Sequence, residues 1–479
     1  MVSVSALPVI QAAADSKSSQ PKTPIKHVIE IMMENHTFDN LFGIYPNDPN
    51  GSNATLESGI SRPVNLLNPH SDLSGLKAVP SGTFSTPDPV EGYTAYHIDW
   101  NWGRMNGFMN GSGPESMTYY TSSQVAPEWI IAQEYAMDQS DYVLMTESNP
   151  NRLYNLAGYS PVVNDYGPAP YIPYSQSVLS ELDHYSISWK YFVKDKTQGY
   201  EPLNYFWGIN QHLSNIGSWA DFTSEVENGT LPSVSWLMPI SGGAPAYYAQ
   251  GPPAEILAGE MWIVHALNLL MHSSIWNSTA VFITYDDAGG YYDQVSPPVI
   301  DGIQMGERVP FILVSPYAKE NYISSTVLDQ GSVPAFIDYN WNIPALNGFV
   351  SKSGIPLDMF DFSQKYGSLN YTSRPPIDLP CMMGSQFSTP SSLSFPEPSS
   401  TGLNFSSIFP AKFQIPLDEV PYSENGSTNY TLSGGALYVQ QNTPFTPFYE
   451  TGWFIVVLLA ATMAISVWLP YMWKRRKAP

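Results

Sequence analysis

Three apolar runs of strand length, each stopping abruptly at polar residues, constrain the fold of this chain most. They are HVIEIMM (27–33), which precedes Glu34, STAVFITY (278–285), which precedes Asp286 and Asp287, and VPFILVSP (309–316), which ends at a turn. Near-continuous runs of Val, Ile and Phe that end at polar residues or at a turn are typical of strands covered on both faces. PAEILAGEMWIVHALNLLMHS (253–273) predicts a helix before the second run. A helix followed by a buried strand indicates an α/β fold with a mostly parallel central sheet flanked by helices.

Composition limits the partners and the chemistry of the chain. A formal charge of −22 argues against nucleic acid as a partner, because phosphate-backbone binding needs clustered Lys and Arg. An acidic medium would suit the chain better, since protonation of carboxylates relieves self-repulsion. The single cysteine, Cys381, excludes an intramolecular disulfide and a thiolate metal cluster. Stability is therefore expected to come from packing.

The C-terminal region predicts a membrane anchor. Residues 451–473 are uncharged and long enough to cross a hydrocarbon core of about 30 Å as a helix. KRRK (474–477) follows at once, which predicts a short basic cytoplasmic tail (474–479) and an extracellular position for everything before the helix. The alternative is a buried core helix. At the other end, residues 1–24 contain a short apolar stretch without a basic region before it, which indicates a weak or truncated signal peptide and a flexible N-terminus.

Two further segments lie between these ends. Residues 25–365 carry the apolar runs and are expected to form the α/β domain, whereas residues 366–450 are Ser- and Pro-rich with short strand patterns and predict a small β-rich appendage. Only 13% of the residues are charged, and N-x-S/T sequons recur along the chain. Attached sugars would supply the hydration that charges otherwise provide, so we expect a glycosylated extracellular surface. The sequons begin at Asn50, Asn53, Asn110, Asn228, Asn277, Asn370, Asn404, Asn425 and Asn429.

The polar residues at two strand ends form a candidate metal site. Ligands of open α/β sheets bind outside the carboxyl ends of the strands, where Glu34, Asn35, Asp286 and Asp287 are expected to lie. Carboxylate and amide oxygens suit Mg, Ca or Mn and are tolerated by Zn. The alternative is that Glu34 and Asn35 cap a following helix while the two aspartates open a loop. Gly289–Gly290, just beyond, would allow close approach of a ligand.

A candidate nucleophile follows at Ser148, in TESNPNRLYNLAG (146–158). Ser148 precedes the turn dipeptide Asn149–Pro150, and a helix is expected to begin at Arg152. A hydroxyl at a strand-to-helix turn is exposed and can be ionised beside a metal. Arg152 could clamp a phosphate or pair with an acid. From the pattern alone, Ser148 as a helix N-cap is the more frequent alternative.

Six ordered blocks from about Ile25 to Leu346 resemble a known family. They are IKHVIEIMMENHTFDNLFG, SNPNRLY, SISWKYF, LPSVSWLMP, AGEMWIVHALNLLMHSSIWNSTAVFITYDDAGGYYDQVSPP, and ERVPFILVSPYAK with DQGSVPAFID. Together they resemble the phosphoesterase family of phosphatidylcholine-type phospholipases C and related acid phosphatases, which is similar in fold to alkaline phosphatases. The resemblance implies an alkaline-phosphatase-like sheet and hydrolysis of a phosphate ester, either a monoester or a phospholipid head group.

The resemblance also implies roles for individual residues. Glu34, Asn35, Asp286 and Asp287 would bind a divalent cation (Ca, Mg, Mn or Zn), and Ser148 would be the nucleophile. Attack by Ser148 on phosphorus would give a phosphoserine that water then hydrolyses, with the cation stabilising the negative charge.

Three histidine positions of the family differ here. DPVEGY places Glu91 where a histidine usually follows D-P-x, ISGGAP replaces an E-H-P element, and DQGS places Gln330 beside Asp329. Two interpretations follow. Either Asn, Gln, Tyr and Arg take over the phosphate contacts, with Glu91 as general acid, or the chain is a catalytically reduced, glycosylated surface protein on the same scaffold. His36 and His97 lie near motif blocks and could approach the site. The sequence leaves the oligomeric state open.

Overall fold

The computed structural model describes residues 20–45, 55–56, 77–84, 88–121, 124–165, 172–197, 199–239, 247–363, 428–433 and 436–441. Within these ranges, one 11-stranded sheet forms the centre of the fold. In spatial order its strands are β2 (Thr55–Leu56), β14 (Tyr322–Ser324), β5 (Ala136–Leu144), β13 (Ile303–Val314), β11 (Thr279–Tyr285), β1 (His27–Met33), β10 (Val234–Leu237), β7 (Trp189–Val193) and β9 (Ile216–Ser218), with β12 (Val299–Ile300) paired to β13 and β15 (Leu328–Asp329) to β5.

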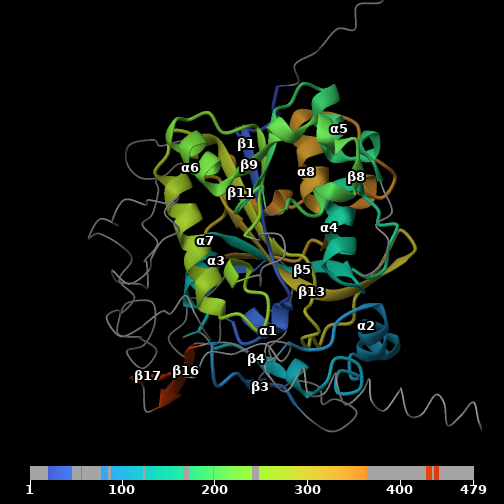
Figure 1. Ribbon diagram of the computed structural model, residues 1–479, viewed down its shortest axis with the longest axis vertical. Helices are drawn as coiled ribbons and strands as arrows, with labels where there is room; N and C mark the ends of the chain where they lie inside the picture. The colour runs from blue at the N-terminus through green and yellow to red at the C-terminus, as the bar shows by residue number, and fades with distance from the viewer. Residues whose placement is uncertain are drawn as a thin grey trace, which may run out of the picture.

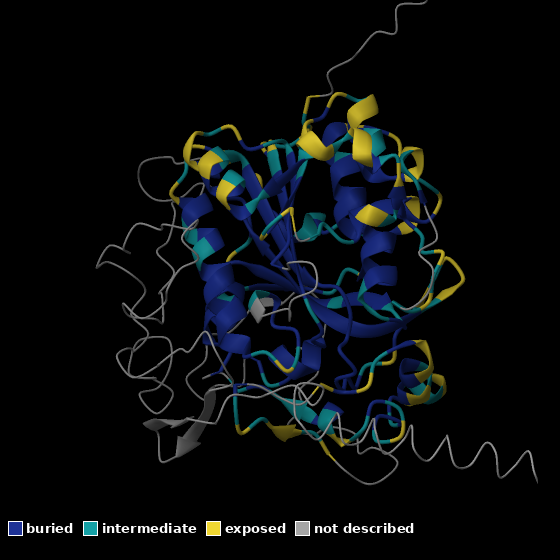
Figure 2. Ribbon diagram, in the orientation of Figure 1, coloured by how far each residue is buried: buried dark blue, intermediate teal, exposed yellow. Residues whose placement is uncertain are grey.

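Helices cover both faces of this sheet. Figure 1 shows α3, α6 and α7 on one side and α4, α5 and α8 on the other. The helices are α1 (Phe38–Phe42), α2 (Tyr93–Trp100), α3 (Ala126–Glu134), α4 (Ser148–Ala157), α5 (Val178–His184), α6 (Trp219–Glu227), α7 (Ile256–Met271) and α8 (Ser332–Trp341). The central strands are buried, whereas exposed residues gather on outer loops and helix surfaces (Figure 2). The expected α/β architecture with a mostly parallel sheet is therefore confirmed.

Strand direction brings the ends of three strands to one edge. β1 is parallel to both of its neighbours, β10 and β11. β13 is antiparallel to β11 and to β5, so β5 and β11 point the same way. The apolar runs beginning at His27 and Ser278 coincide with β1 and β11. The third run is part of a longer strand, β13. The spacing of apolar residues does not distinguish a parallel from an antiparallel strand, so the sequence did not predict the direction of β13.

The two strands that end at this edge are buried along almost their whole length. In β1 every residue after His27 is buried, and all of β11 is buried. Burying one Val, Leu or Ile side chain stabilises the folded state by roughly 1.5–3 kcal/mol. The expected helix at 253–273 is present as α7, which begins at Ile256 because the preceding residues form a turn.

Among the residues that the structure describes, three short strand pairs lie outside the central sheet. They are β3 (Val79–Pro80) with β4 (Thr118–Tyr119), β6 (Ile172–Pro173) with β8 (Phe206–Trp207), and β16 (Thr428–Ser433) with β17 (Ala436–Gln441). The last pair belongs to the segment for which short strands were expected. In the described part of the chain, no helix combines the length and apolar character needed to span a bilayer. The predicted membrane helix at 451–473 and the predicted signal peptide lie outside the described residues.

Candidate active site

The ends of β1 and β11 place the four predicted metal ligands together. In the parallel register, Met33 lies opposite Tyr285, so Glu34–Asn35 and Asp286–Asp287 leave the sheet side by side. Two hydrogen bonds join the strand ends: the amide of Asp286 donates to the carbonyl of Met33 (3.1 Å), and the amide of Asn35 donates to Oδ1 of Asp286 (3.2 Å). Neither residue of the Glu34–Asn35 pair caps the next helix, because Thr37 is the N-cap of α1.

A tight backbone approach holds Asn35 in place. Asn35 has a φ of +65°, and Gly289 has a φ of +60°. A Cβ at residue 289 would lie 2.1 Å from the carbonyl oxygen of Asn35, so only glycine fits there. The amide of Gly289 donates to Oδ1 of Asp287 (2.8 Å), which orients that carboxylate. Gly289, which follows the two aspartates in the sequence, therefore lies directly against the backbone of Asn35.

Ser148 lies at this same edge as the first residue of α4. Its Oγ donates to Oδ2 of Asp287 at 3.2 Å. The helix thus begins at Ser148, earlier than the expected start at Arg152, and its N-cap is Glu147, which makes no side-chain cap hydrogen bond. The N-cap alternative for Ser148 is therefore wrong. Asn151 fixes the turn by accepting from the amide of Leu144 (2.8 Å).

Arg152 lies one helical turn beyond Ser148, and its guanidinium forms ion pairs with two acids. Its Nη2 contacts Oε1 of Glu34 and lies 2.8 Å from Oδ2 of Asp286, the latter without hydrogen-bond geometry. Of the two sequence alternatives, pairing with an acid is the arrangement observed. Burial raises the pKa of Glu34 to about 7, although the Arg152 charge opposes this.

Glu91 joins the cluster although it is distant in sequence. Nδ2 of Asn35 donates to its Oε1 at 2.5 Å. Burial, together with the charges of Asp88, Asp286 and Glu34, raises the pKa of Glu91 well above its ordinary value. This shift favours the protonated form of the carboxyl group, which is the form that a general acid uses.

Gln330, which stands where the family has a histidine, and the two histidines that could approach the site all make structural contacts. Nε2 of Gln330 donates to the carbonyl of Tyr285 (2.9 Å) and so braces the end of β11. His36 is buried and stacks on Tyr291 with ring centroids 5.2 Å apart, and burial lowers its pKa to about 4. His97 contacts the carbonyl of Tyr93 through Nδ1. The whole ISGGAP segment (240–245) lies outside the described residues.

Sequence reasoning missed two acids beside the nucleophile. Oδ1 of Asp165 accepts from the amide of Asn149 (2.8 Å), and its own amide donates to Glu147. Burial raises the pKa of Asp165 to about 6. Asp165 stands in a loop with no apolar periodicity around it, so no pattern in the sequence connects it with Ser148. These contacts lock the turn that presents the Ser148 hydroxyl.

Two buried oxygens at this edge have the chemistry that a divalent cation prefers. Among the described residues, Oδ1 of Asn35 is buried and accepts no hydrogen bond, and Oδ2 of Asp286 is buried with only the Arg152 ion pair. Both are hard oxygens, which Mg, Ca and Mn prefer. No group of three or more His, Cys, Asp or Glu side chains in the described ranges is arranged to hold a metal ion. The roles of Glu34, Asn35, Asp286 and Asp287 as ligands stay predictions.

Comparisons with known proteins identify the family. The Phosphoesterase family model matches residues 25–344, which is more than half of the chain. Phospholipase C A of Mycobacterium tuberculosis is 25% identical over 405 residues, covering 70% of this chain and 76% of that protein. Non-hemolytic phospholipase C of Burkholderia pseudomallei is 25% identical over 398 residues, covering 66% of this chain and 55% of that protein.

A solved structure is also similar, at a lower level. A protein in the alkaline phosphatase superfamily from Vibrio parahaemolyticus is 9% identical, with 70% of each chain covered and a TM-score of 0.33. A similarity of this size supports no conclusion about function. The family match and the phospholipase C relatives do support a conclusion about function. This chain belongs to the phosphoesterase family and is a hydrolase of phosphoric ester bonds.

Proposed function

We propose that this protein hydrolyses phosphomonoesters or phospholipid head groups with Ser148 as the nucleophile and a divalent cation as cofactor. The contact between Oγ of Ser148 and Oδ2 of Asp287, at 3.2 Å, carries the proposal. Asp287 follows Asp286 at the end of β11, beside Glu34 and Asn35 at the end of β1, which supports a position of the hydroxyl close to the proposed oxygen ligands. A hydroxyl among such ligands has the surroundings that phosphoryl transfer requires.

The first step forms a bond between Oγ of Ser148 and phosphorus and breaks the bond from phosphorus to the leaving oxygen. The serine proton has a ready acceptor, since Oδ2 of Asp287 already receives its hydrogen bond. Glu91 supplies a proton to the leaving oxygen, which departs as an alcohol. Water then attacks the phosphorus of the phosphoserine and gives a proton to the Glu91 carboxylate. The bond from phosphorus to Oγ of Ser148 breaks, the phosphate product leaves, and Oγ takes back its proton from Asp287. A cation held by Glu34, Asn35, Asp286 and Asp287 would neutralise charge on the phosphate oxygens.

Arg152 has a positioning role in this scheme. Its guanidinium holds Glu34 and Asp286 through ion pairs and is almost fully buried. Arg152 lies on α4 with Ser148, so the same helix fixes the nucleophile and two of the acids. This arrangement keeps the reacting groups within the small tolerance that in-line attack requires.

Metal dependence and substrate class are testable together. Release of phosphate or alcohol would be measured for a phosphomonoester and for a phosphatidylcholine, with and without chelator, from acidic to neutral pH. Chelator-sensitive turnover restored by one divalent cation is expected, and the preferred ester names the substrate class. Absence of turnover on both esters in folded, cation-supplemented protein would favour the alternative of a surface binding protein.

We further propose that a C-terminal helix anchors the protein in a membrane with the catalytic domain outside the cell. The uncharged residues 451–473, the following KRRK and the sequons support this location. Carbonate extraction of source membranes tests it. The intact chain is expected in the membrane pellet, and recovery in the soluble fraction contradicts the anchor.

A further inference from the structure

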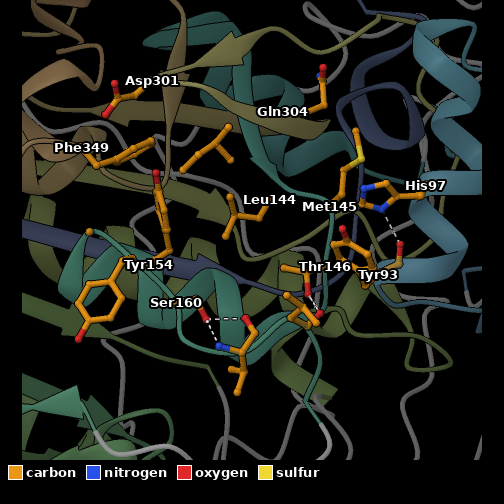
Figure 3. A pocket seen from close by; sticks show the side chains of 15 residues that line it. Tyr93, His97, Leu144, Met145, Thr146, Tyr154, Ser160, Asp301, Gln304 and Phe349 are labelled. Carbon is orange, nitrogen blue, oxygen red and sulfur yellow. Dashed lines mark hydrogen bonds between the residues drawn. The ribbon is translucent and has the colours of Figure 1, made fainter.

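The two sides of the sheet differ near the catalytic turn. On the α4 side, a cavity of about 520 Å³ lies beside α4 and the end of β5, between Tyr93 of α2 and Phe349 (Figure 3). On the opposite side, α3 and α7 cover the strands (Figure 1). Ala249–Gln250 precedes α7 in the chain, and both residues are completely buried. The strand ends are therefore enclosed on the α3 and α7 side, whereas open space remains beside α4.

The backbone of Ala249–Gln250 contacts the end of β1. The amide of Glu34 donates to the carbonyl of Ala249 (2.8 Å), and Nε2 of His36 donates to the carbonyl of Gln250 (2.9 Å). Gln250 has a φ of +69°, and a residue other than glycine keeps such a conformation only where its surroundings over-determine it. The two hydrogen bonds flank Asn35, so the end of β1 is tied to this segment on both sides of a proposed ligand.

The side chain of Gln250 contacts the end of the neighbouring strand, β11. Its Oε1 accepts a hydrogen bond from the hydroxyl of Tyr285, the residue immediately before Asp286. Its Nε2 donates to Oε1 of Glu128 on α3 (3.4 Å) and to Oε1 of Glu260 on α7 (3.3 Å). Gln250 therefore connects the ends of β1 and β11 with each other and with the two helices behind them.

An amide side chain suits all of these partners. Glu128 and Glu260 are buried, which raises the pKa of Glu128 to about 7 and that of Glu260 well above its ordinary value. The Gln250 amide has two N–H donors for these carboxyl groups and one oxygen for the Tyr285 hydroxyl, whereas a carboxylate would only accept. A Cβ at Gly259 would lie 2.2 Å from Cγ of Gln250, so this glycine of α7 leaves room for the side chain.

We propose that Gln250 is a positioning residue that holds the ends of β1 and β11 together in the arrangement of the proposed cation site. The inference rests on the proposed function, because it assumes that the residues at these strand ends bind the cation. Arg152 pairs with Glu34 and Asp286 from α4, and Gln250 acts from the α3 and α7 side. Replacing a residue that supports metal ligands from outside typically weakens metal affinity by about 10–100-fold.

Cation affinity and hydrogen exchange of the full chain test this proposal. Gln250→Met keeps a side chain of similar length but removes its hydrogen bonds. Mn²⁺ would be titrated calorimetrically, and Gln250→Met is expected to bind it about 10–100-fold more weakly than wild type. Amide exchange would be followed by mass spectrometry without cation. Peptides that contain Glu34 or Asp286 should exchange about two- to tenfold faster for each lost hydrogen bond.

Asn340→Leu is the matched control for the loss of a buried amide. Asn340 is buried, and its Nδ2 donates to the carbonyl of Ile25 (3.1 Å), just before the opposite end of β1. This variant should keep wild-type Mn²⁺ affinity and wild-type exchange at the strand ends near the site. Tyr285→Phe removes only the hydroxyl that donates to Gln250, so it should reproduce part of the exchange effect even if Gln250→Met does not fold.

Gln250→Glu tests for rescue by a conservative change. At pH 5 the new carboxyl group, buried beside Glu128 and Glu260, is expected to be protonated, so it can accept from Tyr285 and donate one hydrogen bond. Its Mn²⁺ affinity and strand-end exchange at pH 5 should therefore lie closer to wild type than those of Gln250→Met. A variant no better than Gln250→Met at this pH would contradict the role of these hydrogen bonds.

The remaining outcomes separate this proposal from the proposed function. Mn²⁺ affinity and strand-end exchange in folded Gln250→Met equal to those of Asn340→Leu would overturn the proposal. If wild type binds no Mn²⁺, the proposed cation site fails on its own, and the exchange rates still decide whether Gln250 holds the strand ends.

Discussion

Replacing Gly289 with alanine should damage both stability and catalysis, because the glycine touches the backbone of Asn35. At a φ of +60° any residue with a Cβ pays about 1–2 kcal/mol. The new Cβ would also lie 2.1 Å from the carbonyl oxygen of Asn35, and relief of such overpacking costs about 1–3 kcal/mol. Gly289→Ala should therefore lower the free energy of unfolding by about 2–5 kcal/mol.

A matched control isolates the close approach. Gly302 also has a positive φ (+81°), but a Cβ there meets no atom within 4 Å. Gly302→Ala should lose only the conformational contribution of about 1–2 kcal/mol. Urea unfolding of both variants, followed by circular dichroism, measures the difference. It is expected to be about 1–3 kcal/mol, with Gly289→Ala the less stable.

The same substitution should slow the reaction. Restoring ordinary contact moves the Asn35 carbonyl or the Gly289 turn by about 1 Å, and displacements of that size cost about 100-fold in rate. Turnover by Gly302→Ala should match wild type when both proteins are folded. Equal stability and equal turnover of the two alanine variants would refute the assignment of Gly289 as the residue that positions Asn35.

Three further outcomes follow from the site and the core. Glu91→Gln should reduce turnover of alkyl phosphate esters by about 10²–10⁴, and that of nitrophenyl esters far less because nitrophenolate leaves without a proton; equal losses would contradict the acid role. Burial raises the pKa of Glu30 from 4.5 to about 8. The contribution of Glu30 to the free energy of unfolding is therefore complete below about pH 4.5 and is lost as the pH rises through about 8. The urea concentration at the midpoint of unfolding should decrease as the pH is raised from 5 to 8, and Glu30→Gln should make this decrease smaller. A midpoint that increases with pH would contradict the prediction. Asn35 stands in an N-x-T sequon yet is buried, so glycopeptide mapping should find no sugar there, and a glycosylated Asn35 would rule out the metal site.

The sequence predicted the strand ends well because their physical causes are local. A run of apolar side chains followed by acids defines both where β1 and β11 end and what stands at their ends. Convergence of Glu34 and Asp286 then follows from parallel pairing. The start of α4 was misplaced because its turn is held by Asn151 and Asp165, whose contacts depend on folded neighbours.

Other features of the site lie beyond what a sequence pattern can carry. The antiparallel direction of β13 depends on its connections in space, and apolar periodicity is the same in either direction. Glu91 was assigned through the family resemblance, and only its hydrogen bond to Asn35 places it in the cluster. The cavity beside α4 is built from segments as distant in sequence as Tyr93 and Phe349, which no local pattern connects.

Turnover by Ser148→Ala, measured beside Ser235→Ala, tests the central claim most directly. Ser235 is a buried serine on β10 whose hydroxyl has no partner among the described residues, so its replacement controls for the loss of a serine hydroxyl. With saturating cation and ester, Ser148→Ala should lose at least about a thousandfold in kcat while Ser235→Ala keeps wild-type turnover. Wild-type turnover by folded Ser148→Ala would contradict the proposal that this hydroxyl attacks phosphorus.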